Sequence, residues 1–127
     1  MGEGTGVRAP KGKSYMPMTV GISSFELHFP SSRSLKDKRR IVKSLIDRIH
    51  QRFRVSITET GFHDLHQRGE ISMAVVTNGE SEMEHLLEEV RNMVESVPEL
   101  YLTRWDPQIL SGMEGMTEEM DGMEEMS

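Results

Sequence analysis

The spacing of apolar residues switches between two periods along the chain. They recur at every second position in residues 19–29, 55–59, 71–77 and 100–105, which predicts four β-strands. Between the first and second strands, and again between the third and fourth, they recur every three or four positions, which predicts two amphipathic helices. The apolar stripes are Leu35, Ile41, Val42, Leu45, Ile46, Ile49 and Phe53 in the first helix, and Met83, Leu86, Leu87, Val90, Met93, Val94 and Val97 in the second.

Capping and stop signals bound both predicted helices. Ser34, followed three positions later by Asp37, predicts a capping box at the start of the first helix, and Ser81 with Glu84 predicts a second one. Pro98 ends the second helix. The order strand, helix, strand, strand, helix, strand is typical of the α+β ferredoxin-like fold. In this split βαβ arrangement, two helices cover one face of a four-stranded antiparallel sheet.

The first predicted strand has apolar positions of two opposite parities. These are Val20 and Ile22 in one set, and Phe25, Leu27 and Phe29 in the other. Either a bulge near residues 23–24 shifts the phase, or both faces of the strand are apolar. The third strand is also apolar on both sides. Because an uncovered apolar sheet face favours association, we expect a homodimer or a larger homo-oligomer that forms through the sheet.

Composition divides the 127 residues into one domain and two terminal segments. We expect residues 18–110 to form the ferredoxin-like domain. Residues 1–17 are rich in glycine and basic residues, which predicts a disordered leader. Residues 111–127 hold six acidic residues, five methionines and no basic residue, which predicts a disordered acidic tail. Two other interpretations of this tail stay open: copper(I) binding through its thioethers, and docking onto the basic first helix in competition with RNA.

Three compositional features bear on the compartment. The chain has no cysteine, so it has neither a disulfide framework nor a thiolate metal site. No wholly apolar run approaches the roughly 20 residues that span a bilayer. The N-terminus lacks the apolar segment of a signal peptide. We expect a cytoplasmic protein with no membrane partner.

The net charge of −6 conceals a strong separation of charge. Residues 33–54 hold nine basic and two acidic residues, a local charge of +7. Residues 80–99 hold seven acidic residues and one arginine, a local charge of −6. A field of this asymmetry can steer an anionic partner to the basic helix although the whole chain is acidic.

The basic helix is the first candidate site. We expect its cations to neutralise RNA phosphates, assisted by the positive end of the helix dipole. The predicted nucleic-acid-binding residues are Arg33, Lys36, Lys38, Arg39, Arg40 and Lys43. The alternative is a solvated face complemented by acidic side chains of the second helix. Strand 71–77 has no aromatic residue to stack bases, so binding would proceed through the RNA backbone and shape.

The polar connection 60–69 is the second candidate site, because a connection of this length between strands is often functional. We expect Asp64, Gln67 and Arg68 to fix the loop, or an oligomer contact, by hydrogen bonds. A metal-dependent hydrolytic site here would draw on the metal-ligand types Glu59, His63, Asp64 and His66. Their spacing matches no metal motif, and the chain has no phosphate loop or nucleophile elbow. We therefore expect no metal, no cofactor and no enzymatic activity.

Three motifs in order carry a family resemblance. The segment SLKDKR at 34–39, Asp64-Leu65 with Gln67-Arg68, and AVVTN at 74–78 resemble the YlxP-like proteins. These form a small bacterial family catalogued as a domain of unknown function. The resemblance implies a ferredoxin-like fold over residues 18–105. It also implies a link to ribosome assembly or translation, because genes of this family often neighbour those of translation and ribosome-maturation factors.

The charge pattern and the resemblance together define the expected function. We expect a non-enzymatic accessory protein of ribosome maturation or translation that binds ribosomal RNA or the small ribosomal subunit through the first helix. The alternative is a homo-oligomeric protein-interaction module with no nucleic-acid partner.

Overall fold

The structure, a computed structural model, describes residues 18–112. The predicted leader and nearly all of the predicted tail lie outside these residues. Five strands and two helices follow one another within them. They are β1 (Thr19–His28), α1 (Leu35–Arg52), β2 (Ser56–Gly61), β3 (Arg68–Thr77), α2 (Glu80–Glu95), β4 (Tyr101–Arg104) and β5 (Gln108–Ser111).

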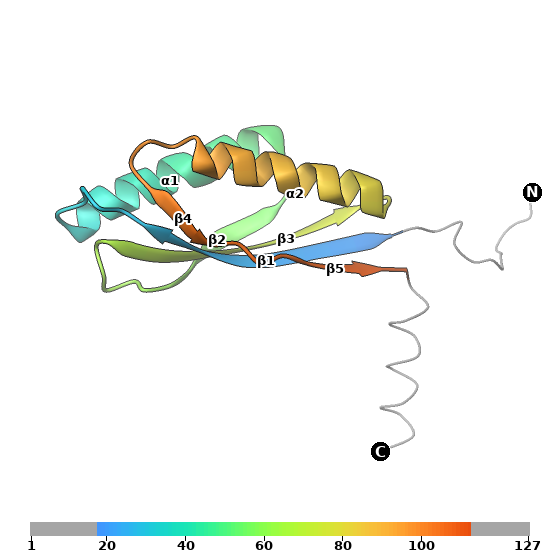
Figure 1. The fold of residues 1–127 in the computed structure, drawn as a ribbon, viewed down its shortest axis with the longest axis horizontal. Coiled ribbons are helices and arrows are strands. Elements are labelled where there is room, and N and C mark those ends of the chain that lie inside the picture. Colours follow the sequence, from blue (N-terminus) through green and yellow to red (C-terminus); the bar gives the residue numbers. More distant parts are fainter. Residues whose placement is uncertain (1–17, 113–127) are drawn as a thin grey trace, which may run out of the picture.

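The strands form one antiparallel sheet in the order β2-β3-β1-β4, and β5 also pairs with β1. Both helices cover the same face of this sheet and leave the other face open (Figure 1). The predicted ferredoxin-like α+β fold is confirmed. The prediction of four strands misses β5, because Asp106 and Pro107 interrupt the edge strand. β4 therefore pairs with residues 26–28 of β1, and β5 pairs with residues 19–22.

The register of β1 decides between the two interpretations of its apolar pattern. β1 pairs with β3 without interruption from Thr19 opposite Thr77 to His28 opposite Arg68. No bulge shifts the phase against β3, so both faces of β1 are apolar. The odd-numbered residues face the helices, and Ile22 is 41% exposed on the open face.

The core lies between the sheet and the two helices. Its fully buried aromatic residues are Phe25 and Phe29, and the Phe25 ring lies 5.3 Å from the ring of Trp105. Gly21 allows α2 to approach the sheet, because a Cβ at this position would lie 2.5 Å from the Sδ of Met83. The helix stripes fill the remainder with Ile41, Val42, Leu45, Ile49, Met83, Leu87, Val90, Met93 and Val94.

The predicted N-cap Ser34 is confirmed, whereas the second predicted capping box is wrong. Ser34 caps α1 and its Oγ accepts from the backbone N–H of Asp37 over 3.0 Å. The carboxylate of Asp37 accepts from the backbone N–H of Arg33 over 3.1 Å. The N-cap residue of α2 is instead Gly79, and no side chain among the described residues caps this end of the helix. Because α2 starts at Glu80, Ser81 already lies inside it. Within residues 18–112, neither helix is both long and apolar enough to cross a membrane.

Candidate nucleic-acid interface

Five of the six predicted cations are exposed at or near the start of α1. We call this set the basic surface: Arg33, Lys36, Arg39, Arg40 and Lys43. Arg40 lies 3.7 Å from a Glu99 oxygen, and Lys43 bonds Asp47 over 3.0 Å. Both pairs are exposed, and such pairs contribute only about 0–1 kcal/mol. The side chains of the other three cations form no ion pair with any residue in 18–112.

Acidic residues of α2 complement α1 only near its C-terminal end. Arg52 donates to Glu89 over 3.0 Å, which joins the end of α1 to the middle of α2. His85 and Arg91 engage glutamates of α2 itself. The alternative of a face complemented by acidic side chains of α2 therefore applies to the C-terminal end of α1, whereas Arg33, Lys36 and Arg39 near its start stay unpaired within residues 18–112.

Lys38 is not part of the basic surface, although the sequence assigned it there. Its side chain is 1% exposed. The Nζ donates to the backbone oxygens of Phe62 over 2.8 Å and Arg68 over 3.1 Å, and lies 3.1 Å from Glu59 Oε2. That carboxylate oxygen is buried and accepts no hydrogen bond of good geometry from the described residues. The ion pair with Lys38 therefore compensates the buried charge of Glu59. Buried in this position, Lys38 cannot reach an RNA phosphate.

A signal in the sequence would have placed Lys38 correctly. Leu35, Lys38, Val42, Leu45 and Ile49 follow one another at spacings of three and four residues. Lys38 thus occupies a position within the apolar stripe of α1 and points toward the sheet. A lysine on that face is buried only if acceptors meet its ammonium, and the end of β2 and the start of β3 provide them.

The second predicted site is a shorter loop than expected. The strands extend to Gly61 and from Arg68, so the connection comprises residues 62–67, which we call the β2–β3 loop. The polar side chains that suggested a longer loop belong to strand ends on the open face. Thr60, for example, bonds the carboxylate of Glu70 over 2.7 Å.

Two of the three predicted loop residues make the expected hydrogen bonds. The Nε2 of Gln67 donates to the backbone oxygens of Pro30 and Ser32, each over 3.2 Å. The guanidinium of Arg68 donates to Glu26 over 3.2 Å and stacks 4.0 Å from the ring centre of Phe62. Asp64 is exposed. The bonds of Gln67 and Lys38 attach the β2–β3 loop to the start of α1 (Figure 1), and the bond from Arg68 to Glu26 joins β3 to β1.

A groove of about 840 Å³ lies between the β2–β3 loop and the neighbouring ends of β1 and β4. Glu26 sits within it and accepts hydrogen bonds from both Arg68, over 3.2 Å, and Arg104, over 2.9 Å. Neither Glu26 nor Arg104 belongs to a sequence motif, because only the sheet register brings these two residues beside the loop. The lining residues are Glu26, Leu27, His28, Asp64, Leu65, His66, Gln67, Arg68, Thr103 and Arg104.

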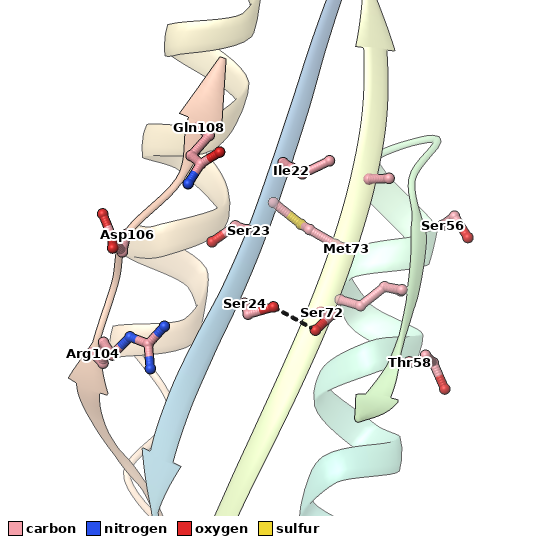
Figure 2. A pocket seen from close by; sticks show the side chains of 12 residues that line it. Ile22, Ser23, Ser24, Ser56, Thr58, Ser72, Met73, Arg104, Asp106 and Gln108 are labelled. Carbon is pink, nitrogen blue, oxygen red and sulfur yellow. Dashed lines mark hydrogen bonds between the residues drawn. The ribbon is translucent and has the colours of Figure 1, made fainter. Parts of the chain in front are cut away.

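The open sheet face has a polar and an apolar part. Hydroxyl groups connect three strands, since Ser72 lies 2.7 Å from Ser24 and 2.7 Å from Thr60. Figure 2 shows the bond between Ser24 and Ser72 beside a second groove of about 430 Å³ that Arg104 also lines. The apolar part includes three exposed side chains: Ile22 at 41%, Val76 at 64% and Leu110 at 53%.

The described residues contain no cluster of three histidine or carboxylate side chains placed to hold a metal ion. Glu59, one of the metal-ligand types near this loop, forms an ion pair with Lys38.

Two comparisons with known proteins cover this fold. The model of a family described as "Protein of unknown function (DUF503)" matches residues 20–106. The chain is also 32% identical over 84 residues to the "Uncharacterized protein YlxP" of Bacillus subtilis (strain 168). That match covers 66% of this chain and 91% of the relative. The family match ends before β5, and neither description carries an activity or a ligand.

Proposed function

Because this chain belongs to the DUF503 family of proteins of unknown function, we propose its function from its surface chemistry. It acts as a non-enzymatic, cytoplasmic accessory protein of ribosome maturation or translation. It contacts ribosomal RNA or the small ribosomal subunit through the basic surface. The observation that carries the proposal is the set of three exposed cations, Arg33, Lys36 and Arg39, that form no ion pair within residues 18–112. The ribosomal destination rests on what the family resemblance implies.

The position of these cations favours phosphate as the ligand. The start of α1 carries the positive end of the helix dipole, which adds to their charge. The middle of the open sheet face presents hydroxyl groups where base-stacking proteins present aromatic rings (Figure 2). Affinity would therefore come mainly from phosphate contacts and counterion release. Three to five such contacts predict a slope of log K against log salt of about −2 to −4.

Co-sedimentation with small ribosomal subunits across a salt series tests the proposal. We expect Arg39→Glu to weaken binding about tenfold, since it reverses an unpaired charge in the basic surface. Arg54→Glu is the matched control: Arg54 is also exposed and unpaired within 18–112, but it lies beyond the other end of α1. Equal losses in the two variants, or an affinity that stays constant with salt, would refute the proposal.

The second candidate function is a homo-oligomeric interaction module. It rests on the exposure of Ile22, Val76 and Leu110 on the open sheet face, which a second copy would cover. In this case the protein would sediment as a dimer or larger species at micromolar concentration, and Val76→Asp would convert it to a monomer. A monomeric wild-type protein would exclude this candidate and leave the first untouched.

A further inference from the structure

We propose that the groove beside the β2–β3 loop binds an unpaired nucleobase of the RNA whose phosphates contact the basic surface. This inference rests on the proposed function and adds a second kind of contact to it. It concerns a part of the molecule that the charge pattern did not indicate.

The groove and the basic surface belong to one rigid end of the domain. Lys38 ties α1 to the backbone of Phe62 and Arg68, and Gln67 ties the loop to the backbone of Pro30 and Ser32. The backbone N–H of Phe29 also donates to Gln67 over 2.9 Å. The loop is therefore fixed relative to the first turn of α1, and an RNA that contacts both would find them already positioned.

The charge of the groove suits a base better than a phosphate. The groove is lined by two arginines, Arg68 and Arg104, and by two acidic residues, Glu26 and Asp64. The formal charges of these four side chains cancel. Glu26 itself already accepts from both guanidinium groups. A phosphate would have to approach these carboxylates, whereas a neutral base meets donors and acceptors together.

The walls of the groove offer stacking and edge contacts. Leu65 is 45% exposed, and the imidazole of His66 beside it is also exposed. The guanidinium carbon of Arg68 lies 4.0 Å from the ring centre of Phe62, and 51% of the Arg68 side chain stays exposed. Unpaired RNA bases stack on imidazole rings and on guanidinium planes of this kind. The side chain of Arg104 is half-exposed, and its guanidinium and the carboxylate of Glu26 can bond the base edge.

Fluorescence anisotropy with two RNA probes of equal phosphate number tests this inference. One probe is a hairpin with a six-nucleotide unpaired loop, and the other is a blunt duplex. The double variant Leu65→Ala/His66→Ala should lower the affinity for the hairpin about tenfold, the size expected for loss of one stacked base, and leave the duplex within twofold. His63→Ala is the control, since His63 is exposed in the same loop but does not line the groove.

The outcomes separate the two proposals. If the double variant leaves hairpin binding unchanged, or weakens both probes equally, the base site is refuted. The phosphate proposal then still stands, provided that Arg39→Glu weakens both probes. If the wild-type protein binds neither probe at low salt, the proposed function fails and the base site falls with it. Crosslinking of a 4-thiouridine in the hairpin loop should modify residues 62–68, and crosslinks confined to α1 would contradict the assignment.

Discussion

Replacement of Lys38 by methionine tests the structural role of the buried ammonium. Methionine keeps an unbranched apolar stem in the core, but it removes the ion-pair partner of Glu59 and the hydrogen-bond donor to the backbone oxygens of Phe62 and Arg68. Removal of one partner from a buried ion pair costs about 3–5 kcal/mol. The side chain of Glu59 keeps 17% of its surface exposed, so water can solvate part of the remaining charge. We therefore expect the lower end of this range, about 3 kcal/mol.

Urea denaturation followed by circular dichroism measures this loss. A loss of about 3 kcal/mol is a large part of the roughly 5–15 kcal/mol that stabilises a domain of this size. Lys36→Met is the matched control, because Lys36 is exposed and unpaired within 18–112, and it should stay within about 0.5 kcal/mol of the wild type. A Lys38→Met protein as stable as this control would refute the buried-ion-pair reasoning.

A double-mutant cycle separates the ion pair from the two carbonyl contacts. Glu59→Gln removes the carboxylate charge but keeps its shape. Lys38→Met/Glu59→Gln should be more stable than the sum of the two single losses predicts, by about 1–2 kcal/mol. It should remain less stable than the wild type, because the backbone oxygens of Phe62 and Arg68 still lack the Lys38 donor. Strict additivity would contradict a direct ion pair.

Three further substitutions test the packing of the sheet against the helices, each by its free energy of unfolding in urea. Phe25→Ala removes a fully buried ring beside Trp105 and should cost about 3–5 kcal/mol, and an unchanged midpoint would contradict its place in the core. Gly21→Ala places a Cβ 2.5 Å from the Sδ of Met83 and should cost about 1–3 kcal/mol, the lower value if the flexible thioether moves. Ser23→Ala should stabilise the protein by about 1 kcal/mol, since the buried Ser23 hydroxyl has no hydrogen-bond partner in residues 18–112, and a loss of stability would reveal one.

The sequence predicted the fold well because two helices and two long strands carry strong periodic patterns. It left the phase of β1 open, since Val20 and Ile22 fit either a bulge or a second apolar face. Only the pairing with β3, whose residues lie about 50 positions further along the chain, decides between these interpretations. Local spacing contains no information about such a partner.

The errors in the predicted strands fall where strands are short or polar. β5 has four residues and follows Asp106-Pro107, so its pattern is too brief to separate from a tail. The last residues of β2 and the first residues of β3 include polar side chains that face solvent, and the hydrogen bond from Thr60 to Glu70 is an example. Polar strand ends and loops have similar compositions, and the predicted loop was therefore too long.

The candidate site shows where a charge pattern alone misleads. All nine cations of residues 33–54 count equally toward the local charge of +7, but the structure gives them different roles. Lys38 is buried against acceptors that lie 21–30 positions away in the chain, and Arg52 is paired with Glu89 of α2. Three cations at or just before the start of α1, Arg33, Lys36 and Arg39, stay unpaired within residues 18–112, because the acidic side chains of α2 pair only near the other end of α1. The buried lysine fixes the β2–β3 loop beside the start of α1, so its loss would displace the groove without removing a single surface charge. Lys38→Met should therefore lower both the free energy of unfolding and the affinity for the hairpin probe. The affinity for the duplex probe should persist under conditions in which the variant is folded.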